Sequence, residues 1–455
     1  MEPSARWPVK LESARSPPHR PSAWPIRASR RTRHHGYTRP SLCPEVLAPA
    51  EQMAPGLTEP RRAEIVVAVH GGPAFDAGDS IRTMHRIGHQ LGVSYPGRQA
   101  VVLLLSESAE RVAAVPLDPR PPPPEVPLLP WSHPGQSALE ATLRAAEAFE
   151  ATAAALVAAD GEEGPTGGAR HLLGPILDDG YDLTAPCYAI QRYEGVFATG
   201  LVYPLTRALF GRRLRQPLGN ELAVSRRAVG HLLGEAWHAD PAHAGERVWL
   251  VCALLAGDFR VSQTCLATRA PRLGDAGADL AASLAQVVGL LFHEARLHAA
   301  SWQRAKGSRL LKTYGEPTLP ADEPGPPQIA PMLGAFQLGH QELQRVWGGV
   351  LPPQTMLALK RLAGEPEERF RIDDPLWARI VYDFAVGYHL ALLDRALLLR
   401  SMTPLYLGWA AGFVRELSGL TATAVEPRVE RLCQAFEAAK PYLISRWRWP
   451  DRFNP

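Results

Sequence analysis

The sequence predicts an α/β protein with a doubly wound, mainly parallel sheet and an all-α carboxyl-terminal region. Short continuous apolar runs, such as Glu64–Val69 and Ala100–Leu105, alternate with helix-like segments in the first part of the chain. Such runs are typical of parallel strands that are covered on both faces. From Ile329 onward the apolar period is helical only. Strand–helix alternation predicts an open sheet whose ligands lie at the carboxyl ends of the strands.

The first predicted strand, Glu64–Val69, is followed by a glycine-containing turn that begins at His70. Asp79 is a candidate amino-terminal cap for a helix over Ile81–Leu91. After the second strand, residues 116–134 are dense in proline and predict an irregular loop. A helix and then a short strand are expected within Ser137–Ala159.

The segment Asp179–Ser225 carries the strongest functional signal. It begins with a strand-like run, continues into a helix-like segment around Leu201–Leu209, and ends in a polar turn, Gly211–Glu221. This turn contains Arg212, Arg213 and Arg215. Guanidinium groups bind phosphates and carboxylates bidentately, so the turn suits a small anionic ligand. A solvated basic turn is the alternative interpretation.

The carboxyl-terminal part predicts at least three helices. Asp373 with Pro375 is a strong helix start, because an aspartate caps the helix and proline suits its first turn. A second start is expected at Thr403–Pro404. Val425–Tyr442 predicts a final amphipathic helix.

Composition limits the function classes. A chain of 455 residues with 46% hydrophobic residues predicts two folded domains, and a net charge of +3 indicates no overall field for nucleic acid. Five scattered cysteines fit thiols in a reducing compartment. With no apolar run of bilayer length, we predict a cytoplasmic protein without a transmembrane segment.

Residues 1–60 are rich in proline and arginine and contain no aspartate. They predict a disordered extension, or one that is not translated because Met53 is the true start. A basic arm for nucleic acid and a targeting peptide are weaker alternatives. The expected organisation is this extension, an α/β domain over 61–315, a linker over 316–330 and a helical domain over 331–448.

The phrase YPLTRALFGRRLRQPLGNELAVS, at Tyr203–Ser225, carries a specific resemblance. It is similar to YPLTRALYGRRIRQPIGGDFGLS of retaining glycosyltransferases related to mannosylglycerate synthase and glucosyl-3-phosphoglycerate synthase. The resemblance extends from about Ile65 over most of the chain. It implies a GT-A fold and transfer of a hexose from a nucleoside diphosphate sugar to a small, anionic hydroxyl acceptor with retention. It also implies a helical tail that packs on the catalytic domain and either closes the acceptor side or forms a homodimer. No nucleic-acid partner is expected.

The resemblance implies a role for individual residues. Glu221 would be catalytic, either orienting the acceptor hydroxyl or stabilising positive charge on the sugar; otherwise it is a helix-start carboxylate. Gly219 is expected to be a backbone necessity. The acceptor would bind to Arg213, Arg215, Gln216, Gly219 and Asn220. The donor would bind to His70, Gly71, Asp160, Arg269 and Arg272.

The expected metal site departs from the family pattern. Relatives bind Mg²⁺ or Mn²⁺ through Asp-x-Asp, where this chain has Val157-Ala158-Ala159-Asp160 and retains one carboxylate. Where relatives have a metal-binding histidine, this chain has Arg269-Ala270-Pro271-Arg272. These arginines could stabilise the diphosphate directly. Two interpretations remain open: an enzyme with altered donor or metal use, or a catalytically silent relative that binds a sugar nucleotide or a partner.

Overall fold

The computed structural model describes residues 62–71, 77–106, 126–159, 168–188, 191–235, 245–266, 280–316 and 325–450. These residues belong to one compact unit. The larger of two hydrophobic cores includes side chains from the sheet, such as Val66, and from the last helix, such as Phe436. The domain boundaries expected from the sequence stay a prediction.

The sheet has eight strands in the order β3-β2-β1-β4-β6-β5-β7-β8 among the described residues. Only β6 runs antiparallel to its neighbours, β4 and β5. The start of β6 therefore lies at the same edge as the carboxyl ends of the other central strands. The strands are β1 (Ile65–His70), β2 (Ala100–Ser106), β3 (Leu128–Ser132), β4 (Ala153–Ala158), β5 (Leu183–Tyr188), β6 (Leu222–Ser225), β7 (Val261–Leu266) and β8 (Thr313–Tyr314).

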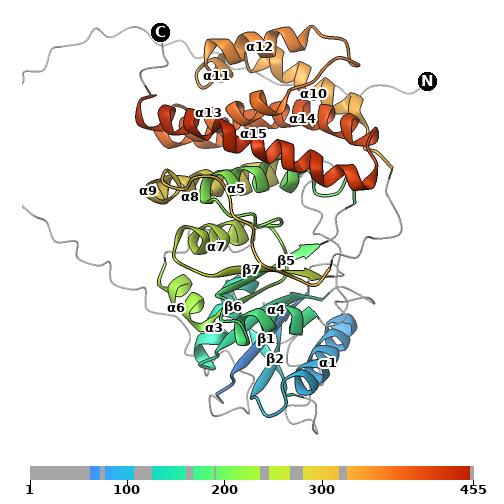
Figure 1. The fold of residues 1–455 in the computed structure, drawn as a ribbon, viewed down its shortest axis with the longest axis vertical. Coiled ribbons are helices and arrows are strands. Elements are labelled where there is room, and N and C mark those ends of the chain that lie inside the picture. The colour runs from blue at the N-terminus through green and yellow to red at the C-terminus, as the bar shows by residue number, and fades with distance from the viewer. Residues whose placement is uncertain are drawn as a thin grey trace, which may run out of the picture. The chain divides into compact units, whose positions relative to one another are not determined.

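Helices cover both faces of the sheet (Figure 1). In β1, Val67 and Val69 face the core beneath α1 and α4, whereas Val66 and Ala68 face the larger second core. Burial on both faces explains why the strands are continuous apolar runs. The helices of this part are α1 (Ala77–Ser94), α3 (Ala138–Ala148), α4 (Gly168–Leu177), the π-helix η3 (Ala198–Val202), α5 (Tyr203–Phe210), α6 (Arg226–Gly234), α7 (Gly245–Ala256), α8 (Leu280–Leu297) and α9 (Ala299–Trp302).

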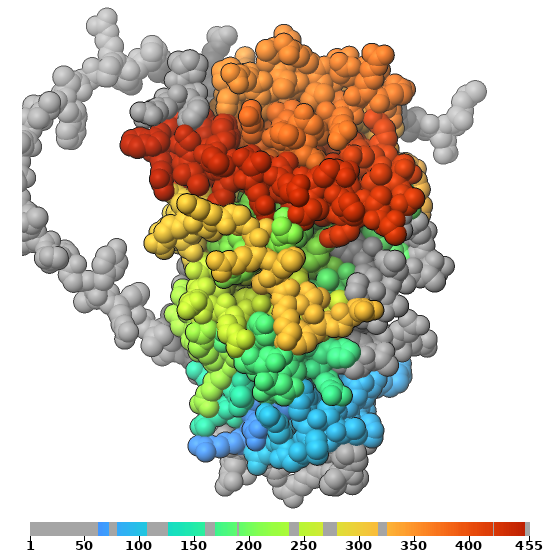
Figure 2. Space-filling view, viewed as in Figure 1, coloured from blue at the N-terminus to red at the C-terminus, as the bar shows by residue number. Residues whose placement is uncertain are grey.

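The carboxyl-terminal helices stack on α5 and α8, on the side of these helices that faces away from the sheet (Figure 1). The long helix α15 packs on α5 and α13, and α14 packs on α8. Figure 2 shows α15 as a red surface ridge between the orange helices α10–α12 and the yellow residues around α9. The six helices are α10 (Ile329–Glu342), α11 (Gln344–Gly348), α12 (Pro353–Ala363), α13 (Asp374–Leu390), α14 (Arg395–Ser418) and α15 (Ala422–Arg448).

Three helix boundaries test the sequence predictions. The start at Asp373 is confirmed, because its carboxylate accepts a hydrogen bond from the Leu376 N–H at 2.8 Å. The start at Thr403–Pro404 is wrong: α14 begins after its cap, Asp394, and contains Pro404. The cap at Asp79 is also wrong, since α1 begins two residues earlier.

Tertiary packing accounts for the proline inside α14. A Cβ at Gly339 of α10 would lie only 2.4 Å from the Pro404 Cβ, so the two helices meet closely at this point. Proline inside a helix costs about 3 kcal/mol, and interhelical packing offsets such a cost. A local start signal cannot anticipate a contact between residues that are so far apart in the sequence.

The predicted fold class is confirmed: a mainly parallel α/β sheet is followed by helices only. Among the described residues, no helix has the length and apolar character that a bilayer span requires.

Candidate active site at the carboxyl edge of the sheet

The polar residues predicted near the donor meet at one edge of the sheet. His70 ends β1 and pairs with Ala158, which ends β4. Glu221 directly precedes β6, whose Leu222 pairs with Leu156 of β4. His70 and Glu221 therefore flank the end of β4 on opposite sides. Gly71 is exposed just beyond β1.

Three predicted donor residues lie outside the part of the chain that the structure describes. They are Asp160, two residues beyond β4, and Arg269 and Arg272, which follow β7. Their predicted roles remain predictions.

Tyr188, at the end of β5, holds the predicted acceptor loop. Its hydroxyl donates a hydrogen bond to the Glu221 carboxylate and accepts one from the Asn220 N–H at 3.1 Å. Its backbone carbonyl accepts a hydrogen bond from the Gln216 side chain at 3.0 Å. Glu221 is 1% exposed. A buried carboxylate with a fixed position is suited to orienting a hydroxyl or stabilising positive charge.

The sequence predicts that Gly219 is a backbone necessity, and the structure gives the reason. A Cβ at Gly219 would lie 2.1 Å from Pro186 Cγ in β5. The described glycines with positive φ do not include Gly219, so the requirement is for space and not for a left-handed conformation.

We expect Gly219→Ala to displace the loop that ends at Glu221. Overpacking of this kind costs about 1–3 kcal/mol, and the shift should also lower activity, because small displacements in an active site have large effects on rate. The matched control is Gly230→Ala in α6, where nothing lies within 4 Å of the new Cβ. This control should be neutral or slightly stabilising. Thermal unfolding of both variants checks the prediction, and equal midpoints would contradict it.

Arg247, in the first turn of α7, brings positive charge to the same edge. The guanidinium is close enough to Glu221 and Glu246 for their charges to act on it, although burial lowers its pKa. Burial and the charge of Arg247 together lower the pKa of His70 to about 4, so this imidazole is neutral at pH 7. The sequence analysis missed Arg247. Its only local signal is a charged residue in the first turn of a very apolar helix.

Two buried nitrogen atoms at this edge have no hydrogen-bond partner among the described residues: His70 Nε2 and Arg247 Nε. Leaving a buried donor unpaired costs about 1–3 kcal/mol. Such atoms are expected where a ligand supplies the missing partner.

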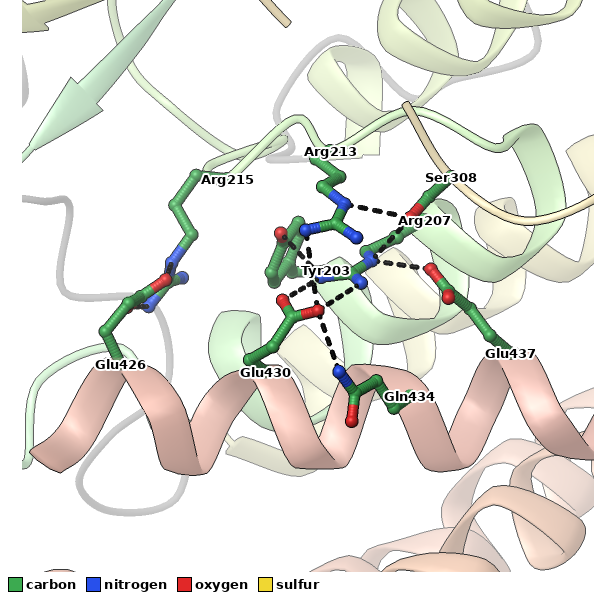
Figure 3. A network of polar contacts seen from close by, with 9 residues as sticks. All are labelled: Tyr203, Arg207, Arg213, Arg215, Ser308, Glu426, Glu430, Gln434 and Glu437. Carbon is green, nitrogen blue, oxygen red and sulfur yellow. Dashed lines mark hydrogen bonds and ion pairs between the residues drawn. The ribbon is translucent and has the colours of Figure 1, made fainter. Parts of the chain in front are cut away.

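The predicted acceptor arginines point toward α15 (Figure 3). Arg213 donates to Ser308 at 3.0 Å and lies 3.5 Å from a carboxylate oxygen of Glu430. Arg215 forms an ion pair with Glu426 at 3.1 Å. The Arg213 side chain is 30% exposed and Arg215 is less exposed, so Arg213 is the more accessible of the two.

Arg207, from the same sequence phrase, is the centre of this network (Figure 3). Its side chain is 0% exposed and contacts Glu430 at 2.6 and 2.8 Å and Glu437 at 2.7 Å. Burial alone would lower the pKa of this guanidinium, but the hydrogen bonds that it donates to Glu430 and Glu437 raise its pKa above the usual value. Buried charge therefore connects α15 to α5, the helix that leads into the loop that ends at Glu221.

The predicted metal ligand lies outside the described side chains, and those side chains form no metal site of their own. No group of three or more His, Cys, Asp or Glu residues is arranged to hold a metal ion in the ranges that the structure describes. The predicted ligand Asp160 lies beyond those ranges.

Comparisons with known proteins give only distant similarities. Neither a protein-family model nor a curated protein matches the chain. Glucosyl-3-phosphoglycerate synthase from Mycobacterium tuberculosis, in complex with Mn²⁺, UDP-glucose and phosphoglyceric acid, is 19% identical, with a TM-score of 0.35, over 51% of this chain and 79% of that one. The mannosyltransferase PcManGT from Pyrobaculum calidifontis, in complex with GDP-mannose and Mn²⁺, is 15% identical, with a TM-score of 0.30, over 86% and 89%. S. aureus TarS 1–349 is 9% identical, with a TM-score of 0.30, over 85% and 92%. Similarities this low establish neither a family nor an activity.

Proposed function

We propose that the chain is a glycosyltransferase that moves a hexose from a nucleoside diphosphate sugar to a small hydroxyl acceptor. The observation that carries the proposal is the meeting of His70, Arg247 and Glu221 at the carboxyl edge of a mainly parallel sheet. Ligands of open α/β sheets bind at this edge. The resemblance of Tyr203–Ser225 to retaining glycosyltransferases gives independent support.

The proposed roles of Glu221 and Arg213 follow from the charges of their side chains. Glu221 would orient the acceptor hydroxyl or stabilise positive charge on the sugar, because its carboxylate is buried and fixed by Tyr188. An acceptor that carries a phosphate or carboxylate would bind Arg213, the more exposed arginine, in place of its distant contact with Glu430. Retention would follow a front-face displacement, for which close positioning of the two substrates is required. A cytoplasmic location and a homodimer remain predictions.

The second candidate is a silent relative that binds a sugar nucleotide or a partner without turnover. It is favoured by the sequence, because Val157-Ala158-Ala159-Asp160 retains only one of the two carboxylates of the Asp-x-Asp phrase that the resemblance implies. Loss of charge that stabilises a leaving group lowers rates by orders of magnitude.

Calorimetric titration separates these proposals. We expect at least one of the UDP, GDP or ADP sugars to bind with a micromolar to millimolar Kd, about −4 to −8 kcal/mol. Release of the nucleoside diphosphate in the presence of glycerate or phosphoglycerate would then establish transfer. Binding without release, with a full panel of acceptors, would favour the silent relative. If no sugar nucleotide binds, the proposed function is wrong.

A further inference from the structure

We propose that the Arg247 guanidinium takes the place of a divalent cation in this site and stabilises the diphosphate leaving group of the donor. This inference rests on the proposed function and adds a residue and a metal-independent mode of binding to it.

The position of Arg247 is the first argument. Its charge acts on His70, at the end of β1, and it interacts with Glu221, at the start of β6. These two strands are the neighbours of β4 on either side. Arg247 therefore lies near the carboxyl end of β4, where the chain has Val157-Ala158-Ala159-Asp160 instead of a phrase with two aspartates.

The side chains of Arg247 and His70 also have unsatisfied hydrogen-bonding capacity within the described part of the chain. Arg247 Nε and His70 Nε2 are both buried without a partner among the described residues. A neutral imidazole can donate or accept a hydrogen bond, whereas the guanidinium only donates. Phosphate oxygens accept hydrogen bonds from both groups, and the guanidinium matches phosphate geometry bidentately.

The chemistry of transfer is favoured by positive charge beside the diphosphate of the donor. The bond between the anomeric carbon and the diphosphate oxygen breaks with both electrons on that oxygen. The acceptor oxygen forms the new bond to the carbon, and the acceptor proton passes to the departing diphosphate. Negative charge grows on the diphosphate as positive charge grows on the sugar. Arg247 would stabilise the negative charge on the diphosphate, and Glu221 would stabilise the positive charge on the sugar.

Titration with UDP and GDP in the presence of EDTA tests the inference on the full chain. We expect the unmodified protein to bind one of them, with a Kd that changes less than about twofold when Mn²⁺ replaces EDTA. Arg247→Met should weaken this binding at least about tenfold. Added guanidinium ion should restore part of the affinity of the variant, which a merely structural role would not allow. Arg226→Met is the matched control, because Arg226 is an exposed arginine at the start of α6.

The outcomes are distinct. Binding that requires Mn²⁺ and survives Arg247→Met would overturn the inference and leave the proposed function standing. If neither diphosphates nor sugar nucleotides bind under any condition, the proposed function fails and the inference fails with it. If Arg247→Met does not fold, Arg247→Lys keeps the charge but loses the bidentate geometry. A Kd for the lysine variant equal to that of the unmodified protein would then argue against a direct bidentate contact.

Discussion

Replacing both Glu430 and Glu437 by glutamine is expected to lower the free energy of unfolding by about 3 kcal/mol. The two substitutions leave the positive charge of Arg207 buried without a counter-charge, because its side chain is 0% exposed. The expected value lies at the lower end of the range for a stranded buried charge, since glutamine oxygens still accept hydrogen bonds. Denaturant unfolding of the full chain measures the effect.

Two controls separate buried charge from surface charge. Glu426→Gln removes an ion pair whose carboxylate is 66% exposed, and the expected cost is at most about 1 kcal/mol. Arg207→Met removes the buried charge itself and leaves two carboxylates that water can reach, so it should cost less than the double substitution. If the double variant unfolds at the same denaturant midpoint as Glu426→Gln, the network does not stabilise the fold.

The second large effect is on catalysis: Glu221→Gln is expected to lower the rate of transfer by about 100- to 1000-fold. A glutamine oxygen can still accept the hydrogen bond from the Tyr188 hydroxyl. The variant loses the negative charge beside the reacting sugar, which also acts on the buried Arg247, so the free energy of unfolding is measured together with the rate. Steady-state release of nucleoside diphosphate from the donor, measured with saturating acceptor, gives the rate.

Two further variants serve as comparisons for the rate of Glu221→Gln. Glu235→Gln changes an exposed carboxylate at the end of α6 and should leave the rate unchanged. Tyr188→Phe keeps the charge of Glu221 but removes its hydrogen bond, so an intermediate loss of about tenfold is expected. A rate for Glu221→Gln within twofold of the unmodified protein would show that this carboxylate has no part in the reaction.

The sheet could be predicted from the sequence because its signals are local. The runs Glu64–Val69 and Ala100–Leu105 contain most of β1 and most of β2, and the Asp373 cap begins α13. Burial on both faces of a parallel sheet produces an apolar run that needs no knowledge of the partner strands. The helix start predicted at Pro404 is wrong because this proline is accommodated inside α14 by a non-local contact with α10.

The candidate site could be predicted only in part, because the fold brings together residues that are far apart in the sequence. Glu221 and Gln216 could be identified from the phrase that contains them, whereas Arg247 comes to the site only through the placement of α7. The ion pairs between the arginines of Tyr203–Ser225 and α15 join residues more than two hundred positions apart. The spacing of Glu426, Glu430 and Glu437 places them along one face of a helix, and this was the available signal.

A crystal structure of the chain with a bound nucleoside diphosphate sugar would locate the donor site. We expect the diphosphate to contact Arg247 and the sugar to lie beside Glu221, at the carboxyl edge between β1 and β6. A donor bound elsewhere on the protein, with Arg247 and His70 paired to other side chains of the chain itself, would contradict this expectation.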